Sequence, residues 1–424
     1  MSTHASHLNT VKPRGAGATT RVFVVATVVA LVHALDDAFV HRGAGLGLTQ
    51  HALAGLVALA AGVAAIVWFP KLRPGLRAAV ALTFGGLALT NGMLHVNHIR
   101  ADGLAGGDVT GVLAAVAGVV LIGLAAVIPW RHRGEGTWAS RAIAVPAMLL
   151  AVVFVLGPVG MGIVSSHKWR EPVGEPPSAA YQEVAFEASD GLDLAGWYRP
   201  SENGAAVVVL HGGSSDRKGS LNHARLLARH GYGVLVYDAR GRGESDGSEN
   251  NYGWDWAKDL SGALAFLKGR DDVDPARIGA VGLSTGADVL LEAAGERDDI
   301  AAVVTDGAAA GSFADWQRLR GTELASVPGW VMFSTIRLLS GDAPGPALED
   351  QMPRIESPTL LISAGTDAER DFNVLYDEAA PDGPVEHWNL PDATHTHAIH
   401  DEPEEYERRV ASFFDRTLSV SEAR

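Results

Sequence analysis

Two hydrophobic patterns divide the chain near residue 170. The first part contains long apolar stretches, at residues 21–40, 52–69, 78–98, 109–129 and 141–164. Each stretch is close to the ~20 residues that a helix needs to cross a bilayer. Beyond residue 178, the apolar runs are short and alternate with amphipathic segments. The first part therefore predicts an all-α transmembrane domain of about five helices, and the second predicts a domain of strands and helices.

The basic residues predict how the five helices are oriented. Lys and Arg cluster before the first stretch and in the loops after the second and fourth stretches, as Lys12, Arg14, Arg21, Lys71, Arg73, Arg77, Arg131, Arg133 and Arg141. The two alternate loops each carry one such residue, Arg42 and Arg100. Because basic loops stay in the cytoplasm, the N-terminus is predicted there, and five crossings place the residues after Trp169 outside. We expect an integral protein of the cell membrane whose second domain is extracytoplasmic.

Polar residues interrupt the first and third stretches. Each set has a spacing that puts its members on one helical face: His33, Asp37 and His41 in the first stretch, and Asn91, His95 and His98 in the third. Imidazole and carboxylate groups suit zinc, so one hypothesis is a metal site. Its candidate ligands are His33, Asp37, His41, His95 and His98. The alternative is a hydrogen-bond network between helices, or histidines at the membrane interface. The lack of a known zinc motif such as His-Glu-x-x-His favours this alternative.

The second part of the chain has the pattern of a doubly wound α/β fold. An Asp190-Gly191 turn between apolar runs predicts a β-hairpin. The predicted strands are Tyr181–Phe186, Leu192–Tyr198, Ala205–Leu210, Gly233–Tyr237, Ile278–Leu283, Ala301–Thr305, Thr359–Ser363 and Val385–Leu390. The predicted helices between and after them are Asn222–His230, Trp254–Lys268, Ala287–Glu296, Phe372–Ala379 and Glu404–Leu418. This order predicts a mostly parallel sheet that binds ligands at the carboxyl ends of its strands.

These patterns define the domain organisation. Residues 1–20 are polar and predicted to be disordered, residues 21–167 form the transmembrane domain, and residues 168–178 form a proline-containing linker. The α/β domain then covers residues 179–420, with an apolar and aromatic segment near 308–350 that could form a small cap.

Composition and charge narrow the function. The 424 residues include no cysteine, which excludes disulfides, thiolate metal sites and a cysteine nucleophile. The net charge is −15, and no segment is both basic and aromatic, so we expect no nucleic-acid partner. No cofactor motif occurs, and we expect none to be needed.

Several motifs follow the predicted strands in a fixed order. The pentapeptide Gly282-Leu283-Ser284-Thr285-Gly286 lies between a strand and a helix, where a tight turn exposes the serine hydroxyl. Leu210-His211-Gly212-Gly213 and the turn at Asp238–Ser245 follow two earlier strands. On these motifs, residues 181–418 resemble an α/β-hydrolase of the serine-hydrolase type, which includes esterases, lipases and serine aminopeptidase-like proteins. The transmembrane part is outside this resemblance.

The resemblance implies a catalytic triad of Ser284, Asp367 and His395. It also implies an oxyanion hole formed by the backbone amide of Thr285 and that of Gly213, with Ser214 as the alternative to Gly213. The residues that could replace the acid or the base are Glu369, Asp371 and Asp306 for Asp367, and His397 and His400 for His395. His211, Asp238 and Arg240 are expected to brace their loops.

The sequence thus predicts a membrane-anchored serine hydrolase that cleaves carboxylic esters. Its substrate would be a small-molecule ester, a lipid or a peptide, and its surroundings would include membrane lipid. The sequence does not identify its protein partners. The alternatives are a serine peptidase or amidase, or an acyltransferase, with the same triad. A different class of alternative is a metal-binding membrane domain with an accessory or inactive hydrolase fold.

The predicted orientation can be tested with a fluorophosphonate that does not cross membranes. We expect it to label the wild-type protein on sealed cells as strongly as on lysed cells, and not to label the Ser284→Ala variant. Labelling that requires lysis would place the α/β domain in the cytoplasm.

Overall fold

The computed structural model describes residues 14–40, 48–102, 104, 106–131, 146, 148, 150–168, 170, 172–321, 324–365 and 368–419. The chain divides into two compact units. One comprises Met1–Arg42 with Ala52–Gly160, and the other comprises Gly43–His51 with Met161–Arg424.

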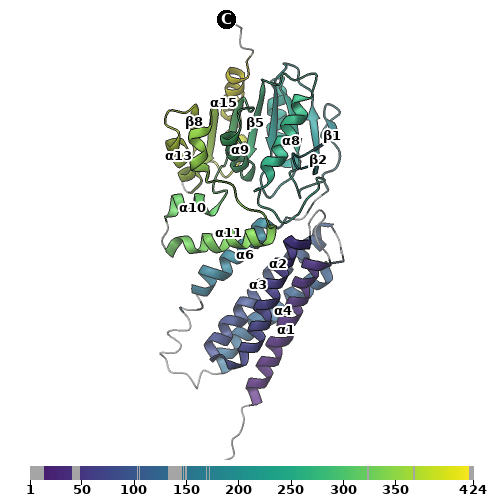
Figure 1. The fold of residues 1–424 in the computed structure, drawn as a ribbon, viewed down its shortest axis with the longest axis vertical. Coiled ribbons are helices and arrows are strands. Elements are labelled where there is room, and N and C mark those ends of the chain that lie inside the picture. Colours follow the sequence, from purple (N-terminus) through teal and green to yellow (C-terminus); the bar gives the residue numbers. More distant parts are fainter. Residues whose placement is uncertain are drawn as a thin grey trace, which may run out of the picture. The chain divides into compact units, whose positions relative to one another are not determined.

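The first unit is helical. Its elements are α1 (Arg14–Phe39), α2 (Leu48–Trp68), the short η1 (Phe69–Lys71), α3 (Pro74–Asp102), α4 (Asp108–Arg131) and the π-helical turn η2 (Val152–Leu156), which continues into α6 (Gly157–Ser166). Helices α1 to α4 lie side by side as a bundle (Figure 1). The side chain of Phe23 on α1 is buried and stacks on Phe69, with 3.8 Å between ring centroids.

Glycines allow α3 and α4 to pack with their backbones close together. A Cβ atom on Gly92 would lie 2.4 Å from the backbone nitrogen of Ala115, and one on Gly118 would lie 2.5 Å from that of Leu89. Neither position could hold a larger residue without the helices moving apart. Small residues at the contact between two helices are typical of helices that associate within membranes.

The structure corrects the expected number of transmembrane helices. Within its described residues, two helical segments are long and apolar enough to cross a membrane, Gly17–Phe39 and Asp108–Arg131. The apolar segments Gly55–Lys71 and Val152–Ser166 are shorter. Helix α3 has the length, but polar side chains such as Asn91 and His95 lower its hydropathy. About five membrane-spanning helices was therefore an overestimate for the part of the chain that the structure describes.

The second unit is built on an eight-stranded sheet. The strands are β1 (Gln182–Glu187), β2 (Asp193–Arg199), β3 (Ala206–Leu210), β4 (Gly233–Tyr237), β5 (Ile278–Leu283), β6 (Ala302–Asp306), β7 (Thr359–Ala364) and β8 (Val385–Leu390). Their order in the sheet is β1-β2-β4-β3-β5-β6-β7-β8. Strand β2 pairs antiparallel with β1 and β4, and the remaining pairs are parallel. All eight predicted strands are present, with their ends within one residue of the prediction.

Helices cover both faces of this sheet (Figure 1). The helices are α7 (Leu221–Arg229), α8 (Trp256–Lys268), α9 (Thr285–Glu296), α13 (Ala368–Ala379), α14 (Ala398–Asp401) and α15 (Pro403–Thr417). Alternate residues of a strand point to opposite faces. Val208 therefore belongs to an apolar cluster that includes residues of α8, α9 and α13, whereas Val207 belongs to one that includes residues of α7 and α15. Because every residue of β3, β4, β5, β6 and β7 is buried, the sequence shows them as continuous apolar runs.

The segment for which the sequence predicts a cap is helical. It contains α10 (Phe313–Arg320), η4 (Leu324–Ser326), α11 (Val327–Ser340) and α12 (Leu348–Gln351). Phe333 and Ile336 of α11 are buried in a small apolar cluster with Trp254. Trp330 on the same helix is 56% exposed, so α11 buries one face and presents another.

Ion pairs fix the turn that follows β4. The guanidinium of Arg240 donates to Asp259 through Nε (2.8 Å) and to both carboxylate oxygens of Asp190 (2.9 Å each). Asp259 is fully buried on α8 and also accepts the backbone amide of Arg240 (2.8 Å). The arginine therefore ties the turn both to α8 and to the β1–β2 hairpin, as expected for a bracing residue.

The Arg240→Ala variant should be less stable than the wild type by about 3–5 kcal/mol, because it leaves the Asp259 carboxylate buried without its cation. Thermal unfolding of the purified full chain measures this as a lower Tm. The matched control is Arg408→Ala, which removes an exposed arginine that pairs with Glu405. Its effect should stay within about 0.5 kcal/mol. An equal decrease in Tm in the two variants would contradict a bracing role for Arg240.

Candidate active site

Ser284 occupies a strained turn between β5 and α9. Its backbone has φ 52° and ψ −120°, one of two positive φ values among described residues other than glycine. Side chains rarely adopt this conformation, and it costs about 1–3 kcal/mol. The amide of Ser284 donates to the carbonyl of Asp306 on the neighbouring strand β6 (2.8 Å), which holds the turn in place.

Two glycines make this turn sterically possible. A Cβ atom on Gly282 would lie 2.3 Å from the carbonyl oxygen of Gly286, and one on Gly286 would lie 2.7 Å from the carbonyl oxygens of Leu210 and His211. Larger residues at either position would therefore push α9 away from the sheet. The glycines of the pentapeptide permit the close approach of strand, turn and helix.

The hydroxyl of Ser284 meets an imidazole. His395, in the loop after β8, places Nε2 2.9 Å from Ser284 Oγ. On the other side of the ring, Nδ1 lies 2.5 Å from Oε2 of Glu369. Because a carboxylate can only accept, Nδ1 carries the proton and Nε2 presents its lone pair to the serine hydroxyl. Ser284, His395 and Glu369 therefore form a continuous hydrogen-bonded chain.

Glu369 is itself held in position. It lies in the first turn of α13, and its second oxygen, Oε1, accepts the backbone amide of Ala364 at the end of β7 (2.7 Å). The hydrogen bond that His395 donates to Glu369 raises the pKa of His395 above its ordinary value of 6.5, despite the opposing effect of burial. The carboxylate thus favours the imidazolium that forms when the ring accepts a proton.

The other acid candidates have different positions. Asp367 lies outside the described residues. Asp371 pairs with its neighbour Arg370 (2.5 Å). Asp306 is buried and accepts the hydroxyl of Tyr406 (2.8 Å), so it joins β6 to α15. In the described part of the chain, the carboxylate in contact with His395 is that of Glu369, which the sequence offered as an alternative.

The other candidates for the base lie farther along the chain, His397 just before α14 and His400 within it. His400 Nε2 accepts from the amide of Asn222 on α7 (3.0 Å). The ring of His397 lies 5.7 Å from that of His400, centroid to centroid. The imidazole that faces Ser284 is that of His395.

The backbone amides proposed for an oxyanion hole adjoin the serine. A Cβ atom on Gly213 would lie 2.6 Å from Oγ1 of Thr285, and one on Gly212 would lie 3.3 Å from Cβ of Ser284. Among the described residues, the amides of Gly213 and Thr285 have no hydrogen-bond acceptor. Both amides are therefore available to a ligand oxygen.

Buried polar side chains hold this loop. Arg242 donates through Nε to the carbonyl of Gly213 (3.1 Å) and through Nη1 to that of Glu249 (3.1 Å). His211 donates through Nδ1 to the carbonyl of Gly212 (2.8 Å), and its Nε2 accepts the amide of Ala239 (3.0 Å). Burial lowers the pKa of His211 to about 4, so the ring is neutral at pH 7. It braces the loop, as the sequence predicts.

A pocket of about 140 Å³ opens at Ser284. It is lined by Val164, Ser165, Lys168, Gly213, Ser214, Arg242, Asn251, Tyr252, Ser284 and Thr285. Its wall therefore combines Ser284, both oxyanion candidates and the segment at the end of α6.

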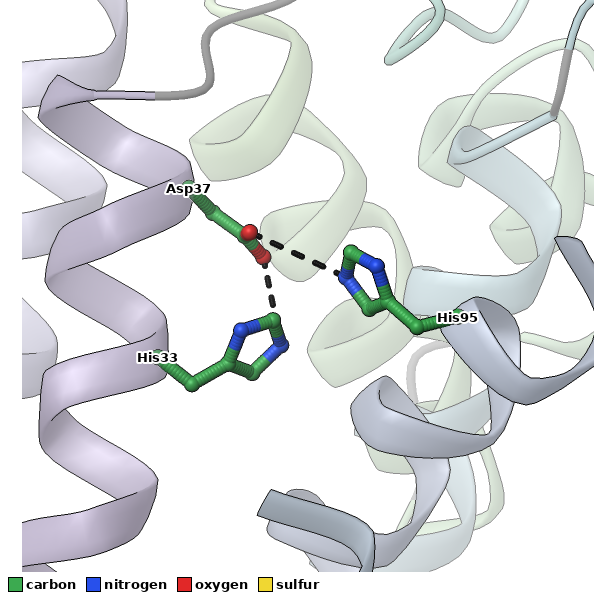
Figure 2. Close-up of side chains that lie close together, drawn as sticks. All are labelled: His33, Asp37 and His95. Atoms are coloured by element: carbon green, nitrogen blue, oxygen red, sulfur yellow. Dashed lines mark ion pairs between the residues drawn. The ribbon is translucent and has the colours of Figure 1, made fainter. Parts of the chain in front are cut away.

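The structure also brings together part of the predicted metal set in the first unit. His33 and Asp37 of α1 and His95 of α3 point toward one another (Figure 2). His41 lies outside the described residues, and the same is true of the side chain of His98.

Comparisons with known proteins agree with the fold. Residues 205–333 match the family model described as the alpha/beta hydrolase fold. The chain is 32% identical over 239 residues to the uncharacterized protein MT2364 of Mycobacterium tuberculosis (strain CDC 1551 / Oshkosh), covering 51% of this chain and 77% of that protein. It is 30% identical over 141 residues to the uncharacterized protein YfhR of Escherichia coli (strain K12), covering 31% and 49%. The solved esterase Pf2001 of Pyrococcus furiosus is similar with 26% identity and a TM-score of 0.47, covering 60% of this chain and 100% of the esterase chain.

The contacts of His395 predict how the reactivity of Ser284 depends on pH. Protonated His395 cannot accept the serine proton, so the rate of phosphonylation by a fluorophosphonate should rise with pH through a pKa above 6.5. Glu369→Gln should lower both that pKa and the plateau rate. Glu378→Gln, an exposed change on the same helix, should alter neither. If the pH–rate curve of Glu369→Gln had its inflection at the same pH as the wild type, the assigned contact between His395 and Glu369 would be contradicted.

Proposed function

Because the chain belongs to the α/β-hydrolase family, we propose that it is a membrane-anchored serine hydrolase that cleaves carboxylic esters through an acyl-enzyme on Ser284. The observation that carries this proposal is the chain of contacts from Ser284 Oγ to His395 Nε2 (2.9 Å) and from His395 Nδ1 to Glu369 Oε2 (2.5 Å). These are the contacts that a nucleophile, a base and an orienting acid need.

In the first half-reaction, His395 Nε2 takes the proton of Ser284 while Oγ bonds to the ester carbonyl carbon. The oxygen that becomes negative is stabilised by the amides of Gly213 and Thr285. The carbon–oxygen bond to the alcohol then breaks, and the imidazolium returns its proton to the departing oxygen. An acyl group remains on Ser284.

In the second half-reaction, water replaces the alcohol. His395 takes a proton from the water as its oxygen attacks the acyl carbon, and the proton then returns to Ser284 when the acid leaves. Glu369 stabilises the imidazolium in both halves. In this proposal Glu369 takes the role that the resemblance implies for Asp367, and paired variants compare the two carboxylates.

The pocket supports a small acyl group. Its volume of about 140 Å³ is below the ~300 Å³ at which pockets for drug-sized ligands begin. Val164 and Ser165 in its wall belong to the apolar segment Val152–Ser166. We therefore propose a short-chain or lipid-like ester as the substrate. A peptidase, an amidase or an acyltransferase would use the same contacts.

Exposed apolar side chains support membrane anchoring. Val109, Leu113, Val116 and Val119 are each more than half exposed along α4, while Ala114, Ala117 and Leu121 are buried. In water, such a helix would expose a continuous apolar stripe, and soluble monomers rarely expose one. Lipid would cover this stripe.

The ester proposal predicts hydrolysis of p-nitrophenyl butyrate by the purified full chain, and no release of p-nitroaniline from aminoacyl p-nitroanilides. Ser284→Ala and His395→Ala should each lower kcat by about 10⁴-fold or more, because each removes a member of a unit that acts together. Cleavage of the anilides with the esters untouched would favour the peptidase alternative, and undiminished ester hydrolysis by Ser284→Ala would contradict the mechanism.

The orienting acid is identified by paired variants. Glu369→Gln should lower kcat by about 10²–10⁴-fold, because His395 loses its hydrogen-bond acceptor. Asp371→Asn, which changes a carboxylate paired with Arg370, should have little effect. A larger loss in Asp367→Asn than in Glu369→Gln would assign the acid to Asp367.

A further inference from the structure

We propose that His33, Asp37 and His95 bind a divalent transition-metal ion, with zinc as the preferred ion. All three ligand atoms lie within 4.8 Å of one another. The site belongs to the helical unit, so it is separate from the Ser284 machinery.

The three side chains converge from two helices (Figure 2). His33 Nε2 lies 3.4 Å from Oδ2 of Asp37, and His95 Nε2 lies 3.7 Å from Oδ1 of Asp37. Ligands at about 2.0–2.1 Å from a tetrahedral zinc ion are roughly 3.3 Å apart. The observed gaps of 3.4 Å and 3.7 Å end on the two different oxygens of Asp37 and are slightly wider than this separation, so the three side chains lie within reach of one ion.

Hydrogen bonds on the far side of each ring fix the required tautomer. His95 Nδ1 donates to Oδ1 of Asp108 on α4 (3.1 Å), which leaves a lone pair on Nε2. His33 Nδ1 lies 3.2 Å from the hydroxyl of Thr110, which in turn donates to Asp36 (2.6 Å). Metal-binding histidines typically donate their other nitrogen to a carboxylate or a similar acceptor.

A further contact confirms which nitrogen of His33 is available. The side-chain amide of Asn91 donates to His33 Nε2 (3.1 Å), so this nitrogen carries a lone pair. The amide would turn aside when an ion takes that lone pair.

Burial and packing support the same site. His33 is 1% exposed and His95 is 7% exposed. A Cβ atom on Gly111 would lie 2.2 Å from Cγ of His95, so this glycine makes room for the ring between α3 and α4. Buried polar groups in a membrane domain are costly unless they are paired or functional. The Asp37 side chain is 35% exposed, which gives an ion and water a path to the site.

The ligand set defines the kind of site. Two imidazoles and one carboxylate supply three of the four positions of tetrahedral zinc. The fourth position would hold water, as in zinc sites that bind substrates. The competing explanation is a hydrogen-bond network without an ion, which would use the same contacts to Asp108 and Thr110 but would give no metal affinity.

The test is the metal content of the full chain, purified in detergent with a tag that contains no histidine. Elemental analysis should find one zinc ion per chain, and His33→Ala and His95→Ala should each lose it. The matched control is Thr83→Ala, because Thr83 also lies on α3 but its hydroxyl donates to the carbonyl of Ala79 (3.0 Å). This variant should keep its zinc.

A second variant separates loss of a ligand from loss of fold. Thr110→Val removes the hydrogen-bond partner of His33 but no ligand, and it should weaken zinc affinity by about 10–100-fold in competition with a fluorescent chelator. The chain has 16 histidines, so the double variant His33→Ala with His95→Ala measures background binding. Wild-type protein that remains metal-free after incubation with zinc, or that binds no more than the folded double variant, would overturn the proposal.

Discussion

The backbone of Ser284, held at φ 52°, is the constraint on which the candidate active site depends. This strained residue is stable because β5 lies inside the sheet, between β3 and β6, and β6 accepts the serine amide. The absence of side chains at Gly282 and Gly286 lets α9 start directly above the strand. The turn lies next to two other loops. Gly212 in the loop after β3 is close to Cβ of Ser284, and His395 in the loop after β8 contacts its hydroxyl.

Around this turn, most of the polar groups near the site are braces. His211 and Arg242 use nearly all of their hydrogen bonds on backbone carbonyls and amides of the surrounding loops. Arg240 and Asp259 play the same part beside β4. The amides that would bind a ligand oxygen make no hydrogen bond that could hold their own loop. Neighbouring side chains must therefore fix this loop through its carbonyl groups. The buried charges next to the pocket are therefore explained by the rigidity that the free amides require.

The sequence could predict the sheet because each central strand is buried on both faces and stands out as an apolar run. The order of the motifs predicted Ser284 and His395 as partners, and the structure places His395 Nε2 2.9 Å from Ser284 Oγ. The sequence could not choose the acid, because Glu369 lies only two residues from Asp367, and Asp367 lies outside the described residues. The number of membrane helices was overestimated because a polar helix, α3, and shorter apolar segments such as Gly55–Lys71 were counted as spans. Helical spacing predicted that His33 and Asp37 share a face, but only packing could reveal that His95 on another helix meets them.

The central claim is that Ser284 carries the acyl group during turnover. It can be tested by quenching the full chain with acid during hydrolysis of p-nitrophenyl butyrate and measuring the mass of its peptides. The account predicts that the peptide containing Ser284 gains the mass of one butyryl group, and that this adduct disappears when substrate is exhausted. A butyryl adduct on another residue would contradict the account. So would folded, active protein that shows a burst of p-nitrophenol release but carries no adduct.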